Sequence, residues 1–269
     1  MYLFLAIPNF SGSTLMHSLL ETVPEVVPLK QQDYMSMFLG GKTDFVEGNM
    51  FAPMGYKRLN GPHSMEANME HVYADPHNYN WSYIKSVWHE NWAGSNPYGT
   101  ILMQKTPADI FRIQHMLPHF PDCKWIISVR EPYSYVESIM RKATFHMEPL
   151  RQLDQVCFHV MRVMELQIAN AKLLGSNACV MTMEDFIDDP EGHVAALSRL
   201  MPELEQIDLS ASLMVKGKKV DSIKNDGPSR VKEMAKVDGL IDRINEYFEP
   251  CEYLINHWGY KMQTAADFH

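Results

Sequence analysis

The chain has 269 residues, of which 46% are hydrophobic, and its formal net charge is −9 at pH 7. This length and composition fit one large domain or two small ones with an ample core. The acidic balance argues against a general binder of nucleic acids or anionic membranes, so any anion-binding site must be locally basic. The longest apolar stretch is far short of a membrane span, and we find no internal repeat or low-complexity tract.

The four cysteines lie far apart and form no CxxC pair: they are Cys123, Cys157, Cys179 and Cys251. This usage predicts reduced thiols, as in a cytosolic protein. An apolar strand that begins at residue 2 leaves no room for a signal peptide, although removal of an upstream anchor stays open. We therefore expect a cytoplasmic protein without a membrane span.

The first twenty residues predict a strand, a tight loop and a helix. Residues 2–7 form an unbroken apolar run, which is typical of a central strand covered on both faces. Small residues follow at 11–14, and leucines at helical spacing come next, with Ser11 or Ser13 as the expected helix cap. Such a loop directs backbone N–H groups and a positive helix end at one spot, which most often binds a phosphate. The alternative is an ordinary strand-to-helix turn.

The rest of the chain alternates strands with helices. Further strands are predicted at 101–105, 124–129 and 178–182, with a short extended piece at 24–28. Helices are expected after Pro107 with Thr106 as N-cap, from 132 to about 141, from 150 to Gly175, from Asp189-Pro190 to Leu200, and in a tail that ends near Trp258. This alternation predicts an α/β fold with a mostly parallel central sheet flanked by helices.

The segment 30–100 is less regular and rich in aromatic residues, Met and His. We interpret it as a cap or insertion packed on the sheet of a single domain that spans 1–269. Trp81, Ile84, Lys85 and Trp88 fall on one helical face. Aromatic residues of such a cap can line a substrate pocket, but ordinary core packing explains most of them.

Three polar features follow predicted strands, so they should meet at the carboxyl edge of the sheet. They are the Ser11–Thr14 loop, Lys105, and Arg130 with Ser138. The loop can hold one phosphate, and Arg130 with Ser138 can hold a second, because a guanidinium matches phosphate bidentately. The alternatives are that Lys105 is merely a surface lysine at a strand end and that Arg130 forms a structural ion pair with Glu131 or Glu184.

These motifs, in this order, resemble the sulfotransferase family that uses 3′-phosphoadenosine 5′-phosphosulfate (PAPS). Residues 8–14 are similar to its Pro-x-Ser-Gly-[Ser/Thr]-Thr loop, which binds the 5′-phosphosulfate. Arg130 and Ser138 match its strand-end Arg and the Ser eight residues later, which bind the 3′-phosphate. Residues 104–107 and 183–190 look like stretches found in many members, and residues 225–230 and 258–260 are similar to the C-terminal cofactor loop and ending of the protein-tyrosine and carbohydrate branches. The chain also resembles the bacterial small-molecule branch. The resemblance covers nearly the whole chain and implies a P-loop-like three-layer fold.

The resemblance implies an enzyme that moves a sulfuryl group from PAPS to a hydroxyl or amine and releases 3′-phosphoadenosine 5′-phosphate (PAP). The cofactor-binding residues it implies are Asn9, Phe10, Ser11, Gly12, Ser13, Thr14, Leu15, Arg130, Ser138, Lys224, Ser229 and Arg230. Lys105 would neutralise charge on the transferring group, and the scheme needs no metal. The acceptor would be a small molecule, a saccharide or a peptide, and no nucleic-acid partner is expected.

Two departures from the family pattern concern the chemistry. Phe10 stands where the family usually has Lys or Arg, and Lys105 is expected to take over that charge. The family's glutamate base falls in the stretch 29–33, where only Asp33 is acidic. We name Lys105, His63 and Asp33 as catalytic residues, with His17 and Glu47 as further bases to test.

Two other functions stay open. A P-loop nucleotide kinase or NTPase shares the strand–loop–helix logic, but the Gly-x-x-x-x-Gly-Lys-[Ser/Thr] pattern is absent. A non-catalytic, nucleotide-binding relative of sulfotransferases would explain Phe10 and the missing glutamate. His115 and His119 have a metal-like spacing, but no third ligand follows, so no metal site is predicted.

Overall fold

The computed structural model describes residues 1–29, 81–95, 98–143, 153–215, 218–220 and 226–268. Most of the expected cap at 30–100 lies outside these ranges. The predictions that named His63, Asp33, Glu47 and Lys224 also lie outside the described residues.

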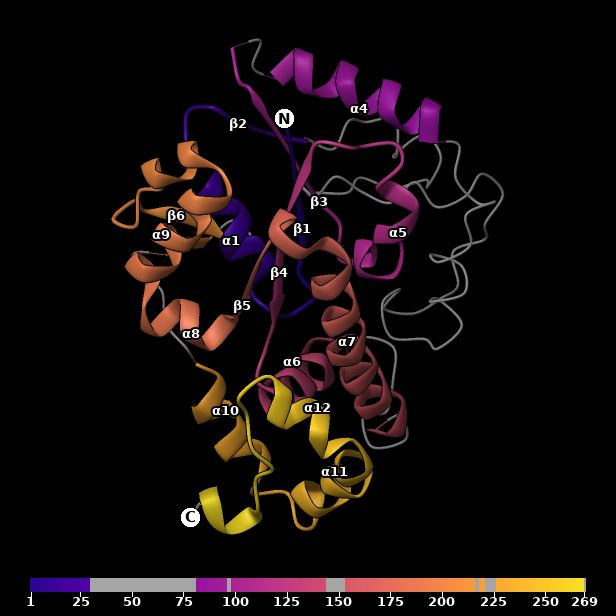
Figure 1. Ribbon diagram of the computed structural model, residues 1–269. Coiled ribbons are helices and arrows are strands. Elements are labelled where there is room, and N and C mark those ends of the chain that lie inside the picture. The colour runs from indigo at the N-terminus through magenta and orange to yellow at the C-terminus, as the bar shows by residue number, and fades with distance from the viewer. Residues whose placement is uncertain (30–80, 96–97, 144–152, 216–217, 221–225, 269) are drawn as a thin grey trace, which may run out of the picture.

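A five-stranded, fully parallel sheet forms the centre of the molecule (Figure 1), in the order β2-β3-β1-β4-β5. The strands are β1 (Tyr2–Ala6), β2 (Val26–Pro28), β3 (Ile101–Lys105), β4 (Cys123–Val129) and β5 (Ala178–Thr182). The first strand lies in the middle, with β3 on one side and β4 on the other. The predicted α/β, P-loop-like fold with a parallel central sheet is confirmed.

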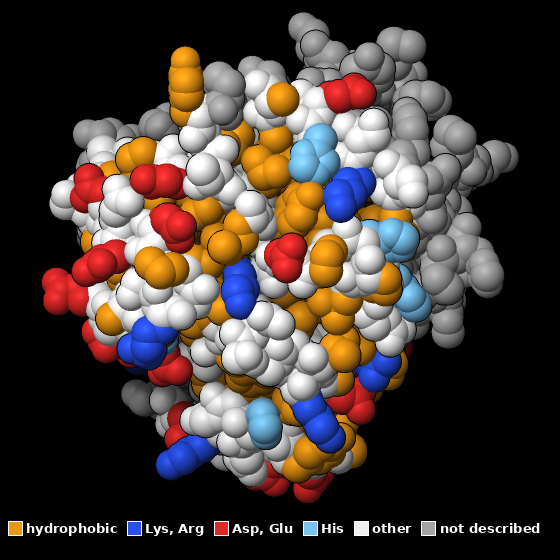
Figure 2. Space-filling view, turned by 45° about the horizontal axis from the view of Figure 1, so that its top comes forward, with side chains coloured by type: hydrophobic (Ala, Val, Ile, Leu, Met, Phe, Trp, Pro, Cys, Tyr) orange, Lys and Arg blue, Asp and Glu red, His pale blue; other side chains and the backbone are white. Residues whose placement is uncertain are grey.

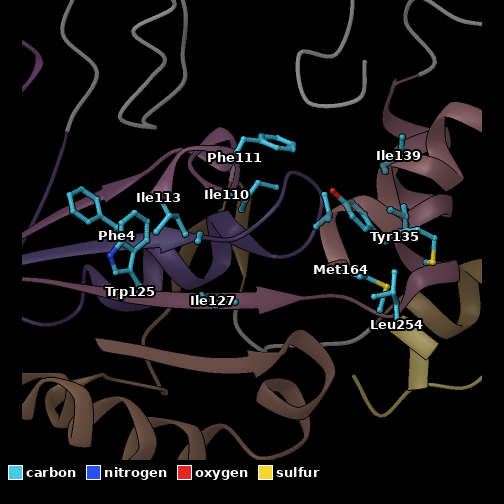
Figure 3. Close-up of a cluster of buried hydrophobic side chains, with 14 of the residues drawn as sticks. Phe4, Ile110, Phe111, Ile113, Trp125, Ile127, Tyr135, Ile139, Met164 and Leu254 are labelled. Atoms are coloured by element: carbon cyan, nitrogen blue, oxygen red, sulfur yellow. The ribbon is translucent and has the colours of Figure 1, made fainter. Parts of the chain in front are cut away.

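Both faces of β1 are buried, and its alternate residues enter two separate cores. Phe4 and Ala6 belong to one core, and Leu3 and Leu5 belong to the other. In the first core, Phe4 packs against Trp125 of β4 with 4.7 Å between the ring centroids (Figure 3). A strand covered on both faces needs apolar residues at every position, which is why the run 2–7 was a clear signal.

Helices cover both faces of the sheet (Figure 1). Their bounds are α1 (Ser13–Leu20), α4 (Trp81–Ser95), α5 (Ile113–Met116), α6 (Pro132–Ala143), α7 (Leu153–Leu174), α8 (Met183–Asp188), α9 (Pro190–Leu200), α10 (Gly227–Met234), α11 (Leu240–Phe248) and α12 (Glu252–His257). Short 3₁₀ turns lie at η2 (Pro107–Phe111), η4 (Gly175–Asn177), η5 (Pro202–Gln206), η6 (Glu249–Cys251) and η7 (Ala265–Phe268). The helix α8 and an antiparallel hairpin of β6 (Leu213–Val215) and β7 (Lys218–Val220) were not predicted.

The predicted cap of α1 is wrong, whereas Thr106 occupies its predicted N-cap position. Gly12 occupies the N-cap of α1 and no side chain caps this helix, because Ser13 is already its first residue and the Ser11 hydroxyl donates to the Asn9 carbonyl. Thr106 does precede the next helical turn, but its side chain makes no cap hydrogen bond. The Thr106 hydroxyl instead accepts a hydrogen bond from Gln104 Nε2, and a 3₁₀ turn replaces the expected helix start.

The three tryptophans and Ile84 of α4 belong to the core. Each of these side chains is at most 5% exposed: Trp81, Ile84, Trp88 and Trp92. They belong to the same core as Phe4 and Phe120, whose rings lie next to Trp88. The interpretation of these residues as core packing is therefore confirmed. Among the described residues, no helix is long and apolar enough to cross a membrane.

Candidate anion-binding site at the carboxyl edge of the sheet

The loop between β1 and α1 makes its turn with two left-handed residues. Phe10 has φ +64° and Gly12 has φ +83°. The Ser11 N–H donates to the Pro8 carbonyl over 3.3 Å, which closes the first bend. The first N–H groups of any helix have no acceptor within the helix, so the start of α1 presents donors at the carboxyl edge of the sheet.

Gly12 lies close against the side chain of Met183. A Cβ built on Gly12 would lie 2.4 Å from Met183 Sδ, and Met183 is only 5% exposed at the start of α8. A left-handed φ already disfavours a residue with a side chain here. The loop is therefore packed against the start of α8, directly after β5.

Lys105 is the last residue of β3 and pairs with Leu5 of the neighbouring central strand. The side chain is 1% exposed, and its Nζ donates to Thr14 Oγ1 in the first turn of α1 over 3.4 Å. A buried ammonium is stable only with polar or anionic partners. Lys105 therefore brings a positive charge to the same helix start at which the loop ends.

Arg130 follows β4, the other neighbour of β1, and its side chain reaches the loop. Its Nη1 donates to the Phe10 carbonyl over 2.8 Å and to Ser138 Oγ over 3.0 Å. Ser138 lies in α6 and is fully buried. The structure thus brings the loop, Lys105, and the Arg130–Ser138 pair into one site, whereas their roles as nucleotide ligands stay predictions.

Burial and neighbouring charges act in opposite directions on Arg130. Desolvation lowers its pKa from the ordinary value, and the carboxylates of Glu184, Glu137 and Glu131 raise the pKa again. The guanidinium of Arg230 also lowers the pKa of Arg130, which places a second positive charge nearby. Arg230 itself pairs with Asp226 over 2.8 Å at the start of α10.

The three carboxylates near Arg130 are held by other donors. Glu137 pairs with Arg141 over 2.6 Å. Glu131 accepts the backbone N–H groups of Tyr133 and Ser134, over 3.1 and 2.6 Å, and so caps α6. The hydrogen bonds of the Arg130 side chain go to the neutral oxygens of Phe10 in the loop and Ser138 in α6.

Glu184 is the third of these carboxylates, and the C-terminal segment holds it. Its Oε2 accepts the Glu131 N–H over 3.1 Å and the Tyr260 hydroxyl over 2.6 Å. Burial, followed by the Glu184 charge, raises the pKa of Tyr260 above its ordinary value. The segment after α12 is therefore attached to the turn that carries Arg130.

The remaining predicted residues that the structure describes lie in different places, some in the loop and others in α1 or α10. Asn9 and Leu15 lie in the loop and in the first turn of α1, beside the donors described above. Ser229 is exposed, and its hydroxyl donates to the Asp226 carbonyl. His17 is 5% exposed in α1 and faces Glu21, with 3.4 Å between Nδ1 and Oε2.

The metal-like spacing of His115 and His119 does not produce a shared site. His115 lies beside Gln114, and the ring of His119 stacks on Trp81. In the part of the chain that the structure describes, no group of three or more His, Cys, Asp or Glu residues could hold a metal ion.

Tyr135 is a site residue that sequence reasoning missed. Its buried hydroxyl lies 3.1 Å from His159 Nε2 of α7. Figure 3 shows Tyr135 in the cluster of buried side chains. Burial raises the pKa of Tyr135, and a hydrogen bond with the Ser11 side chain opposes that shift. An aromatic residue on an amphipathic helix looks like core packing, so no sequence signal separates Tyr135 from its neighbours.

The fold and this site define a P-loop-like α/β protein in which a loop, a buried lysine and an arginine–serine pair meet at one sheet edge. A sequence model of the sulfotransferase family matches residues 10–202, well over half of the chain. The chain belongs to the sulfotransferase family.

Two solved structures resemble this one over 98% of the chain. The sulfotransferase domain from the curacin biosynthetic pathway is 13% identical, with 98% of its own chain covered and a TM-score of 0.53. A sulfotransferase from Alicyclobacillus acidocaldarius is 14% identical, with 97% of its chain covered and a TM-score of 0.53. At such low identity these likenesses show the fold alone. No curated protein sequence matches the chain.

Proposed function

We propose that the protein is a PAPS-dependent sulfotransferase that transfers a sulfuryl group to a hydroxyl or an amine and releases PAP. The single observation that carries the proposal is the bridge made by Arg130. This side chain bonds both the loop, at the Phe10 carbonyl, and Ser138 of α6. Two anion-binding clusters therefore lie within the length of one side chain.

The residues fit a ligand with an anionic group at each end of a nucleoside. The start of α1, with Thr14, offers N–H and hydroxyl groups for the 5′-phosphosulfate. Arg130 and Ser138 offer a guanidinium fork and a hydroxyl for the 3′-phosphate, and Arg230 adds a nearby positive charge. Because Gly12 is packed against Met183, a ligand at the loop would approach from a side that Met183 leaves open.

The bound donor would supply an activated sulfuryl group, and this chain would position it and neutralise its charge. Lys105 holds its ammonium beside Thr14, where negative charge builds up on the bridging and sulfuryl oxygens. The acceptor oxygen forms a bond to sulfur while the sulfur–phosphate oxygen bond breaks, and that electron pair leaves with PAP. The acceptor proton passes to a base, for which His63 and Asp33 stay our predictions.

Phe10 is the observation that favours a second candidate, a relative that binds the nucleotide without transferring the sulfuryl group. Its position contributes a backbone carbonyl to Arg130 and no basic side chain to the donor. The buried ammonium of Lys105 supports the catalytic proposal. Lys105 ends β3, the strand beside β1, and would supply the positive charge that Phe10 lacks.

Calorimetry and a transfer assay together test the proposal. We expect PAP to bind more tightly than ATP with magnesium, and sulfuryl transfer from labelled PAPS to at least one member of a panel of phenols, sugars and peptides. Tighter binding of ATP would favour a kinase instead. Binding of PAP without transfer across the panel would favour the non-catalytic relative.

Two further proposals concern the whole chain. All four cysteines are free, which supports a reducing compartment such as the cytoplasm. We also propose that residues 1–269 form one domain, with 30–100 as the acceptor-side cap, because α4 from this segment packs into the core of the sheet. The acceptor would then be a small molecule, a saccharide or a peptide that this cap recognises.

A further inference from the structure

Two buried amides stand on one face of α7, three residues apart. Gln167 is 0% exposed and Asn170 is 7% exposed. A buried amide is unfavourable unless its N–H and C=O groups find partners, and an apolar residue of similar size would fill the same space at less cost. Amides at these two positions therefore call for a reason beyond packing.

Gln167 joins the carboxyl ends of two neighbouring strands. Its Nε2 donates to the Ala6 carbonyl over 2.5 Å and to the Ser128 carbonyl over 3.1 Å. Both carbonyl oxygens can only accept hydrogen bonds, so the NH₂ group of the Gln167 amide must face them and the orientation of the amide is fixed. Ala6 is the last residue of β1, just before the loop, and Ser128 lies two residues before Arg130.

Asn170 extends the same network to the third strand that serves the site. Its Nδ2 donates to Gln167 Oε1 over 3.1 Å and to the Ile110 carbonyl over 2.9 Å. Ile110 belongs to η2, the turn that begins two residues after Lys105. The two amides are thus connected to the end of β1, the end of β4 and the turn after β3.

The geometry points to Gln167 and Asn170 as positioning residues that set the spacing between the loop, Arg130 and Lys105. The chain crosses from β3 over β1 to reach β4, and the ends of adjacent strands separate at such a switch point to form the ligand crevice. Gln167 bridges β1 and β4 at the base of this separation. This inference rests on the proposed function, because it concerns a ligand held at both ends.

The affinity of a ligand with two anionic ends depends on the distance between the loop and Arg130. Binding at one cluster needs only that cluster, but binding at both needs the correct distance between them. The affinity of PAP relative to adenosine 5′-monophosphate (AMP), which lacks the 3′-phosphate, therefore measures how well the loop and Arg130 are placed with respect to each other.

The experiment compares PAP and AMP binding to the purified full chain by calorimetry. Gln167→Met keeps the length of the side chain and removes both donor bonds. We expect this variant to lose about tenfold or more of the preference for PAP, while AMP affinity changes little, because misplacement by about 1 Å is enough for effects of this size. Asn170→Leu is the second variant and is expected to reduce the same preference several-fold, with a larger loss in turnover.

Leu174→Ala is the matched control. It removes a buried side chain from the last turn of α7, next to the amino end of β5 and away from the site. It should lower the melting temperature and leave the preference for PAP unchanged, which separates positioning from general loss of stability. A folded Gln167→Met or Asn170→Leu protein with wild-type preference overturns the inference. A wild-type protein with no preference for PAP overturns the proposed function, and the inference with it.

Discussion

Arg130 and Phe10 are joined by a hydrogen bond of 2.8 Å between the guanidinium Nη1 and the Phe10 carbonyl oxygen. Among the described residues, Phe10 is the only non-glycine residue with a positive φ, at +64°. A left-handed backbone costs a residue with a side chain about 1–2 kcal/mol. The bond to Arg130 offsets part of this cost and joins the loop after β1 to the end of β4.

Arg130→Lys tests this bridge. A lysine keeps the charge but lacks the planar fork, so it cannot bond the Phe10 carbonyl and Ser138 Oγ in the same way. We expect PAP affinity to fall by about tenfold or more, since one hydrogen bond to a charged group contributes about 1.5–3 kcal/mol. Calorimetry measures the change. Arg199→Lys, at an exposed position of α9, is the control. Unchanged PAP affinity in Arg130→Lys would contradict the bridge.

Gly12→Ala tests the fit between the loop and Met183. Gly239 also has a positive φ, at +66°, but a Cβ there would meet nothing within 4 Å. Both alanine variants should lose about 1–2 kcal/mol of unfolding free energy through the backbone. Gly12→Ala should lose more, because its Cβ would lie 2.4 Å from Met183 Sδ. Urea unfolding measures both. Equal losses in the two variants would rule out a tight contact with Met183.

Lys105→Met removes the buried charge and keeps an apolar stem of similar length. We expect turnover to fall by ~10²–10³-fold, the usual effect of removing one group that stabilises charge in the transition state. The effect on PAP affinity should be smaller, because the loop and Arg130 remain. Lys236→Met is the control, since Lys236 is exposed and pairs with Glu233. A near-native rate in Lys105→Met would reject the proposed role.

The sequence predicts those strands and helices whose local pattern of apolar residues reflects how they are buried. Buried parallel strands are continuously apolar, so β1, β3, β4 and β5 were found close to their true bounds. The cap of α1 was wrong because Ser11 and Ser13 fit a general preference, whereas the structure places the left-handed Gly12, packed against Met183, at this position. The helix α8 and the β6–β7 hairpin are too short to show a period.

The site was predictable where its residues follow strands or share a helix face. The strand ends indicated Lys105 and Arg130, and helical spacing indicated Ser138. Gln167 could not be found in this way, because its carbonyl partners lie 161 and 39 residues away in the sequence. A lone glutamine on a long helix looks like a solvated residue until the fold brings those strand ends to it.

The C-terminal segment is attached to the start of α6 through Tyr133. The Tyr133 hydroxyl donates to Asn245 Oδ1 over 2.6 Å and accepts the Gln263 N–H over 2.9 Å. Burial raises the pKa of Tyr133 from the ordinary 10.0 to about 12. The native state therefore binds this proton more tightly than the unfolded chain does. The resulting stability is complete below about pH 10 and is lost as the pH rises toward 12.

Tyr133→Phe removes this titration together with its hydrogen bonds. At pH 8 the variant should be less stable by about 0.5–1.5 kcal/mol for each net hydrogen bond lost. Between pH 10 and pH 12 its stability should fall less steeply than that of the wild type, because one of the raised tyrosine pKa values is gone. Urea unfolding across this range measures both effects. Tyr253→Phe changes an exposed tyrosine and should keep the wild-type slope. An equally steep fall in Tyr133→Phe would show that this hydroxyl does not control the alkaline limit.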